Sequence, residues 1–466
     1  MIVSKLIALS WYIFNSCPMS AAIDFTYQYA FPSGMHVANN KPRFSLATCD
    51  ANFATPYFFD GRVRSPKIMG DMLFTLSEVV RTHFFLPQPA LLDPVLTSNE
   101  NLLRLEGFSG CCGVYARVDL PSQAFEGECH GRGTTNVDFN TPMRNALLRM
   151  RDNEDVHFSV GKDEVSLRKG DNKIIEKKVK LPLRWIKGFS EVQAYQPSLS
   201  LKMEISAVEA LRFVRSLPKA SKPKMSSYVV CSGKAIRLTH RPQKGAISFQ
   251  GTHRVKIIEP LLVRANKLRI WYNEDDRTSA WEVCFPIGSF FLMISPEVFR
   301  GFSGEGQVLS DLAKSSSDEL IAQTRAQLKW QSEIDISALA KALKKDKEDI
   351  KTALSVLGTR GLAGFDVTTG HYFHRELPFD LSKVEDMQPR LKNARKIVAS
   401  GKVTLIESDK NKTIYQLPGT GTMHRVQLKD SGDTCTCPWF SKYLGKRGPC
   451  KHILAAQIIN AENHEK

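Results

Sequence analysis

The chain has too few cysteines for a disulfide-stabilised scaffold. Ten cysteines are spread over 466 residues, and seven of them follow no pattern. The other three, Cys435, Cys437 and Cys450, crowd one short segment. This distribution excludes the small cysteine-rich secreted folds and suits a protein of a reducing compartment, so we expect a cytoplasmic location.

Long apolar runs are missing as well. The apolar stretch at residues 6–14 is too short to cross a bilayer, and no other stretch is suitable, so we expect no membrane partner. Lys5 precedes this stretch and small residues follow at 20–22, which is the order of a signal peptide. The alternative, which we favour, is that residues 1–23 are an extension and that translation starts at Met19, because patterned sequence begins near Phe25.

Acidic residues are outnumbered by basic ones. The 64 lysines and arginines against 48 aspartates and glutamates give a formal net charge of +16 and a pI near 9.3. Such a balance favours a polyanionic partner, either nucleic acid or an anionic membrane surface. A merely solvated lysine surface is the alternative. The apolar fraction of 42% and the charged fraction of 24% exclude a disordered or fibrous chain.

Motifs of common enzyme classes are also missing. The sequence has no Walker A motif, no nucleophile elbow and no His-Glu-X-X-His. Gly419-Thr420-Gly421 lacks the strand-to-helix setting of a phosphate loop and is predicted as a hairpin turn. We therefore expect a non-catalytic protein. An enzyme in the N-terminal half is a third hypothesis, because catalytic residues distant in sequence leave no local pattern.

Residues 24–315 are predicted as a mixed α/β region, and the whole chain as a multidomain α+β protein. A strand–helix–strand–strand unit recurs, and each copy leaves an apolar face exposed, so copies are expected to join into continuous sheets. Helices are predicted at 66–84, 142–150, 207–217 and through 262, and strands at 136–139, 156–160, 164–168, 199–205, 227–231, 235–239, 268–272, 281–285 and 290–294. The order of elements resembles the repeated units of DNA sliding clamps.

Gly-Phe-Ser-Gly occurs twice, at residues 107–110 and 301–304. We predict a repeated turn with a buried Phe, in which glycine supplies a positive φ, and a ligand loop is the alternative. Cys111-Cys112 and Cys129-His130 are possible metal or redox groups, but burial is the commoner role of free cysteine, so we expect core packing.

Residues 316–380 are predicted as a polar helix or linker, two short helices and a β-hairpin. The two helices carry apolar residues from Ile336 to Leu343 and from Ile350 to Leu357, with Asp346 as a cap between them. The arrangement resembles a winged helix, which implies a second helix in the DNA major groove and a hairpin on the backbone. The cations that would serve are Lys344, Lys345, Lys347, Lys351, Arg360, His371, His374 and Arg375. Glu348 and Asp349 argue against tight DNA contact, and many winged helices bind protein instead.

Residues 385–462 carry a metal-ligand pattern. Cys435-Thr436-Cys437 is separated by residues 438–449 from Cys450-Lys451-His452. Three thiolates and one imidazole at this spacing suit one tetrahedral zinc ion. Four protein ligands leave no position for water, so the predicted zinc is structural rather than catalytic. A helix that begins at Cys450, together with Lys451, would lower the pKa of the thiol.

This pattern and its neighbours resemble the SWIM-type zinc finger. Cys437-Pro438-Trp439, the strand around 424–426 and the lead-in helix and strand at 395–403 belong to the resemblance. With segments 58–61, 108–115, 132–136 and 301–306, the chain resembles a bacterial family of SWIM zinc-finger proteins without an assigned reaction. The resemblance implies binding of DNA or protein. The protein alternative is an adaptor for an AAA+ ATPase or a von Willebrand factor A partner.

The basic C-terminal half is expected to contact nucleic acid. Lys442, Lys446, Arg447 and Lys451 would contact phosphates. Trp439, Phe440 and Tyr443 lie among these cations, a mixture that suits stacking on unpaired bases. The alternative for Trp439 is packing over the zinc site. The sequence leaves the oligomeric state open.

Overall fold

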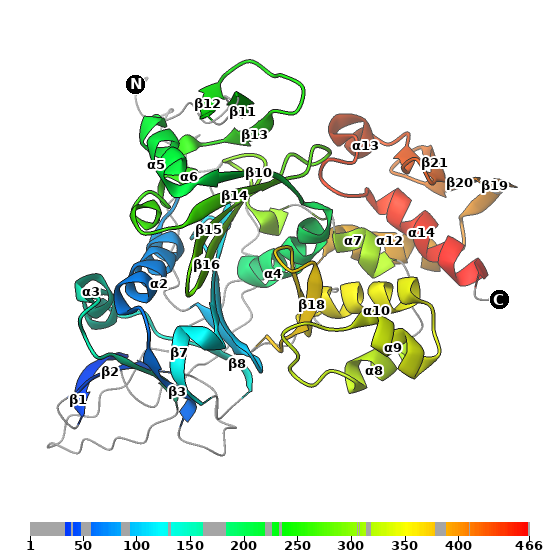
Figure 1. Cartoon of the computed structure of the whole chain (residues 1–466). Helices are drawn as coiled ribbons and strands as arrows, with labels where there is room; N and C mark the ends of the chain where they lie inside the picture. The colour runs from blue at the N-terminus through cyan, green and yellow to red at the C-terminus, as the bar shows by residue number, and fades with distance from the viewer. Residues whose placement is uncertain are drawn as a thin grey trace, which may run out of the picture.

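The structure is a computed structural model that describes residues 33–38, 41–47, 57–84, 94–128, 132–161, 183–219, 226–232, 235–304, 306, 308–313, 318–377, 388–409 and 411–464. The described residues form helices and several β-sheets, so the α+β prediction is confirmed (Figure 1). The predictions for residues 1–23, the strand at 164–168 and Cys129-His130 lie outside the described residues. Within the described part, no helix has both the length and the apolarity that a membrane span requires.

An eight-stranded sheet forms the centre of the molecule. Its order is β10-β14-β15-β16-β6-β5-β4-β8. In that order, the strands are Ser200–Ser206, Lys267–Tyr272, Ser279–Phe285, Gly288–Ile294, Val114–Pro121, Leu102–Phe108, Val95–Ser98 and Gly133–Asn136. β16 and β6 pair antiparallel, with Phe290 opposite Val118, and this pairing joins separate copies of the predicted unit. The expectation that copies join into continuous sheets is confirmed for this sheet.

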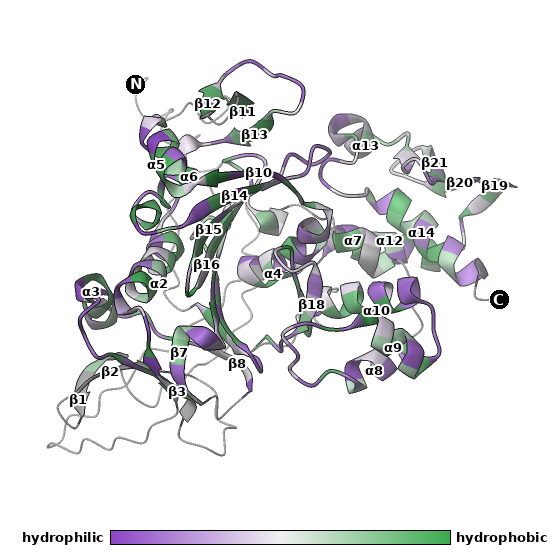
Figure 2. Ribbon diagram, viewed as in Figure 1, coloured by the Kyte–Doolittle hydropathy of each residue, from purple (hydrophilic) through white to green (hydrophobic). Residues whose placement is uncertain are grey.

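Amphipathic helices cover this sheet. In α2 (Pro66–Arg81) the fully buried Met69, Met72, Leu73 and Leu76 follow helical spacing and pack toward β5 and β6. α3 (Thr141–Arg149) packs against α2, and α5 (Ala207–Ser216) packs against β10 and β14. α4 (Leu183–Tyr195) contacts Phe108 of β5 through Phe189. Figure 2 shows hydrophobic residues along the central strands and hydrophilic residues in outer loops such as the one that joins β12 to β13. α2, α3 and α5 confirm the helices predicted at 66–84, 142–150 and 207–217 within a few residues. α4 is not predicted from the sequence, and the helix predicted through 262 is wrong, because only a short 3-10 turn lies at Leu261–Val263.

Two smaller sheets flank the centre. One has the order β1-β2-β9-β3-β7 and the other β12-β11-β13. In these orders, the strands are Gly34–Ala38, Lys41–Ala47, His157–Gly161, Tyr57–Val63 and Phe125–Glu128, then Ala235–Thr239, Ser226–Ser232 and Ile247–Gln250. The strand predicted at 136–139 is wrong by three residues, because β8 ends at Asn136.

The two Gly-Phe-Ser-Gly segments pack against each other. Phe108 and Phe302 are both buried, with ring centroids 6.4 Å apart, and the Phe302 amide donates a hydrogen bond to the Cys112 carbonyl (2.9 Å). The prediction of a buried Phe is confirmed, but the positive φ is wrong for Gly107 and Gly301. Glycine is needed for close approach instead, because a Cβ on Gly301 would lie 2.5 Å from the Cys111 carbonyl oxygen.

Three helices and a hairpin follow, as the sequence predicts. They are α8 (Asp318–Ala326), α9 (Ile336–Leu343), α10 (Lys347–Thr359), β17 (Ala363–Asp366) and β18 (His371–His374). The Asp335 carboxylate caps α9 by accepting from the Ser337 and Ala338 amides (2.8 and 3.0 Å). Asp346 is the N-cap residue of α10, but its side chain makes no capping hydrogen bond. These helices enclose a small core of their own around Ile350, Leu354 and Leu357.

The hairpin is docked on the central sheet. The Asp366 carboxylate bonds to Arg104 and Arg117 of β5 and β6, and Arg375 donates twice to Glu106 (2.6 and 2.7 Å). Arg375 and Glu106 are fully buried. The prediction that His374 and Arg375 contact DNA is therefore wrong.

A second observation contradicts DNA contact by His374. Its ring stacks on the Trp330 ring, with centroids 4.4 Å apart, and only 5% of the residue is exposed. Of the predicted wing cations, His374 and Arg375 are thus buried, whereas His371 stays exposed.

Candidate metal centre

The C-terminal module is a four-stranded antiparallel sheet packed with helices. Two of the helices, α12 and α14, lie against each other, and α7 adds to the same core. The elements are α7 (Val308–Ala313), α12 (Pro389–Ala399), β19 (Thr404–Asp409), β20 (Lys412–Pro418), β21 (Met423–Lys429), β22 (Thr434–Cys435), α13 (Pro438–Tyr443) and α14 (Lys451–His464). Gly421 has a φ of +78°, which confirms the hairpin turn predicted between β20 and β21.

The four predicted ligands converge in this module. Cys435 ends β22 and pairs with Val426 of β21. Cys437 is the N-cap of α13, Cys450 directly precedes α14, and His452 lies in the first turn of α14. One ligand atom from each of the four residues lies within 4.8 Å of the others, and all four residues are buried. The sequence prediction of the ligand set is confirmed.

Backbone amides surround the thiol groups. The amides of Cys437, Phe440 and Ile453 donate to the sulfurs of Cys435, Cys437 and Cys450, each at 3.4 Å. Such bonds favour the thiolate, which is the metal-binding form. A hydrogen bond from the Cys435 thiol lowers the pKa of Cys450 to about 4 and raises that of Cys435.

Three sulfurs this close ionise together only around a cation. Soft thiolates with one imidazole in a closed set of four select a structural Zn²⁺ ion, so the centre binds one zinc. The same closed set argues against an exchangeable water on the metal.

His452 uses one ring nitrogen for the metal. Its Nδ1 atom lies 3.9 Å from the Cys435 sulfur, so Nδ1 faces the ligand cluster. Its Nε2 atom is buried and has no hydrogen-bond partner among the residues that the structure describes. The His424 ring lies 4.5 Å from the His452 ring and covers one side of it.

A cluster of cations and aromatic rings supports the loop before Cys450. The Trp439 ring lies 4.9 Å from the Arg390 guanidinium and 5.4 Å from that of Arg447, and 4.5 Å from the Tyr443 ring. Arg390 also donates to the carbonyls of Arg447 (2.6 Å) and Pro449 (3.0 Å). Trp439 thus packs beside the zinc site, in agreement with the alternative that the sequence left open.

The predicted phosphate-contacting cations fall into two separate groups. Lys442 is exposed on α13, and Lys446 is exposed on the zinc loop, which is the segment 444–449 between α13 and Cys450. Arg447 and Lys451 are half-buried. The second group has Lys344, Lys345 and Lys347 at the turn between α9 and α10, and Lys351 further along α10. Figure 1 shows α13 apart from this turn, so the structure does not bring the two groups together.

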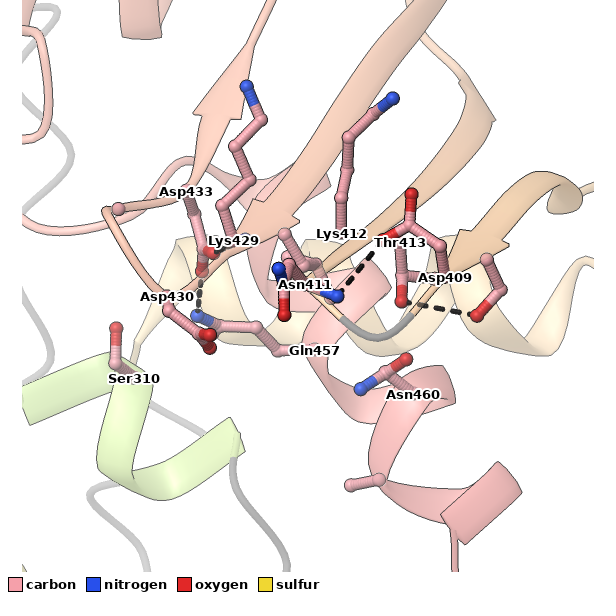
Figure 3. A pocket seen from close by; sticks show the side chains of 14 residues that line it. Ser310, Asp409, Asn411, Lys412, Thr413, Lys429, Asp430, Asp433, Gln457 and Asn460 are labelled. Atoms are coloured by element: carbon pink, nitrogen blue, oxygen red, sulfur yellow. Dashed lines mark hydrogen bonds between the residues drawn. The ribbon is translucent and has the colours of Figure 1, made fainter.

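The module has a hollow at each end of α14. A pocket of about 490 Å³ lies at the start of the helix, beside Cys437, Cys450 and His452. A second pocket, of about 750 Å³, lies beside Gln457 and Asn460 near the other end. Figure 3 shows three carboxylates around this second pocket, at Asp409, Asp430 and Asp433, together with Lys412 and Lys429. The module therefore has a zinc end and an acidic end, at which carboxylates outnumber lysines.

A third hollow, of about 720 Å³, lies between the central sheet and the hairpin, and Asp119, Glu282 and Asp366 line it. Burial raises the pKa of Glu282, which accepts from Trp271 Nε1 and Thr368 Oγ1 (both 3.2 Å). Burial also acts to raise the pKa of Asp366, but Arg117 and Arg104 outweigh it and hold that pKa below its usual range. Each carboxylate is engaged with a cation or donor, as in a structural interface.

Sequence reasoning missed both this interface and the role of Arg390. Arg117 and Asp366 are 249 residues apart, and no local pattern marks such a pair. A basic residue at the start of a helix is similarly too common to identify Arg390 as a support of the zinc loop.

Comparison with known proteins agrees with the metal centre. Residues 424–456 match the family model of the SWIM zinc finger, so the resemblance inferred from the ligand spacing is confirmed. No curated protein sequence matches the chain. Among solved structures, the crystal structure of proliferating cellular nuclear antigen from Entamoeba histolytica is similar at 10% identity and a TM-score of 0.35. The match covers 52% of this chain and 99% of that one.

Proposed function

We propose that this zinc-finger protein is a non-catalytic, cytoplasmic protein that binds nucleic acid through one basic face of its C-terminal module. The supporting observation is a charge pattern. Residues 388–402 and 434–461 contain nine lysines and arginines and no aspartate or glutamate. The first stretch forms α12 and the second forms α13, the zinc loop and α14, and α12 packs against α14.

The zinc ion supports this surface by folding it. The metal ligands lie at the start of α13 and of α14, on both sides of the loop. Binding of the metal therefore positions the cations of the loop. Binding of a polyanion releases its condensed counterions, and affinity then falls steeply as salt rises. Thiolate ligands in such a site also suit a reducing compartment.

The turn between α9 and α10 has a secondary role in this proposal. Lys351 is paired with Glu348 (2.6 Å), and Glu348 and Asp349 share the exposed start of α10 with the lysines. The docked hairpin buries His374 and Arg375, two of the predicted wing cations. A winged-helix mode of DNA contact is therefore weakly supported compared with the zinc module.

The test is fluorescence anisotropy of the full-length protein with single- and double-stranded DNA at two salt concentrations. The double variant Lys442→Gln, Lys446→Gln removes two exposed charges without disturbing the Arg447–Trp439 stack. We expect it to reduce the slope of log affinity against log salt by about 1.4 for single strands and about 1.8 for duplex. Lys344→Gln, Lys345→Gln is the matched control at the α9–α10 turn. No binding at low salt, or equal slopes in parent and variant, would contradict the proposal.

An adaptor function is the second candidate, and the edge strand β19 favours it. All six residues of β19 are exposed, including Leu405 and Ile406, and the strand lies at the edge of its sheet. An exposed edge of this kind accepts an added strand from a partner, such as an AAA+ ATPase or a von Willebrand factor A protein. Capture of partners with and without nuclease distinguishes the two functions, because a true adaptor keeps its partner after nuclease treatment.

A further inference from the structure

The pocket beside the zinc ion has the lining of an anion-binding site. Its described lining residues include no carboxylate, and two of them, Arg390 and Lys451, are cations. The thiolates of Cys437 and Cys450 also line it, but they bind the metal ion, which offsets their charge. Asn393, Thr420 and Thr422 add an amide and two hydroxyls. Its volume of about 490 Å³ falls within the range of pockets that enclose small organic ligands.

A buried donor at this pocket needs an acceptor. His452 lines the pocket, is only 3% exposed, and has an Nε2 atom without a partner among the described residues. Because Nδ1 faces the sulfurs, Nε2 carries the proton. The second nitrogen of a metal-bound histidine almost always donates to an oxygen acceptor, and a buried unpaired donor is costly.

The helix that holds His452 favours a negative charge at the same place. α14 has 14 residues, and Lys451 is its first, so the positive end of the helix dipole and an ammonium group lie together. Trp439, Pro389 and Pro438 provide apolar walls beside these polar groups. Such a combination fits a flat, partly apolar ligand that carries one anionic group.

We propose that this pocket binds one unpaired nucleotide, with a phosphate oxygen accepting from His452 Nε2 beside Lys451. The base then lies against the apolar walls, and its edge meets Asn393 and the threonine hydroxyls. The inference rests on the proposed nucleic-acid function and gives it a substrate class, single-stranded rather than fully paired strands.

The test uses the full-length zinc protein and a short single-stranded oligothymidylate. The variants are Lys451→Gln and Thr422→Val, with Lys429→Gln as a control for charge at the acidic end of the module. We expect Lys451→Gln to reduce the single-strand salt slope by about 0.7 and Thr422→Val to lower affinity about two- to tenfold. The Lys429→Gln protein is expected to bind as the parent does. Zinc content is measured for every variant, so that loss of the metal is not mistaken for loss of the pocket.

A direct readout is the Nε2–H resonance of His452 in ¹⁵N-labelled protein. The oligonucleotide is expected to shift it, and inorganic phosphate to shift it in the same direction. If DNA binds but the resonance does not shift, and the Lys451→Gln and Lys429→Gln proteins bind DNA equally well, the pocket assignment is overturned. The proposed function stays intact in that case. Absence of any DNA binding at low salt defeats both. A shift caused by an acidic peptide and not by the oligonucleotide also overturns the nucleotide assignment.

Discussion

The hairpin interface and the zinc module use basic residues in opposite ways. At the interface, Arg104, Arg117 and Arg375 are almost completely buried, and each is paired with a carboxylate. In the zinc module, Lys442 and Lys446 are exposed, and the surrounding segment has no carboxylate at all. The position of the counter-charge, not the number of cations, therefore separates a structural cation from a binding one.

The difference also explains why the net charge of +16 is a weak guide by itself. Cations that form ion pairs within the fold stabilise one arrangement of the chain, and their charge contributes little to the binding of a partner. Exposed cations in a stretch of chain that contains no carboxylate raise the local potential and attract anions. Four changes to the chain test this contrast.

The largest expected effect is loss of the metal. Cys450→Ser removes a ligand, so zinc binding and folding of the C-terminal module should be lost together, because structural zinc contributes about 10–16 kcal/mol in small zinc domains. Elemental analysis and limited proteolysis check this, and the central sheet should stay protected. Cys231→Ser, at an exposed position of strand β11, is the control. A Cys450→Ser protein that keeps its zinc would disprove the ligand assignment.

The next effect concerns a buried ion pair. Arg375→Met leaves Glu106 charged and without its partner in a fully buried site, at a cost of about 3–5 kcal/mol. The free energy of unfolding in urea measures it. Lys351→Ala breaks the exposed pair with Glu348 and should cost less than about 1 kcal/mol. Equal costs for the two variants would remove the distinction between the buried and the exposed cations.

Asp366 gives the interface a pH dependence of predictable sign. Its pKa in the folded protein lies below its unfolded value, so its contribution is present above a pH of about 4 and is lost as pH falls toward the folded pKa. Asp366→Asn should therefore flatten the acid limb of the stability curve, measured as the urea midpoint against pH. Asp409→Asn, on the exposed strand β19, should leave that limb unchanged.

The smallest effect on stability is expected in the zinc module. Lys442→Gln with Lys446→Gln should change the free energy of unfolding by less than about 0.5 kcal/mol, because both side chains are exposed. The same variant should lose DNA affinity at low salt. A large loss of stability would show that these lysines are structural, as the buried arginines are.

The sequence predicts the features that depend on the spacing of residues close together in the chain. The ligand set follows from Cys-X-Cys and Cys-X-His, and α10 follows from the helical spacing of Ile350, Leu354 and Leu357. The docked hairpin does not follow, since Arg375 and Glu106 are 269 residues apart. The exposed wing expected for residues 371–375 came from resemblance to a fold, and a fold leaves open which face is covered. Close approach at Gly301 likewise depends on a distant segment.

Cys437 and Cys450 each accept a hydrogen bond from the amide three residues onward, at the start of α13 and α14. One metal ion therefore holds the N-terminal ends of both helices. While the metal stays bound, neither helix can fray from its first turn. When the metal leaves, both helices lose this support in the same event. Unfolding of the module is thus expected as a single step whose rate is the rate of metal release.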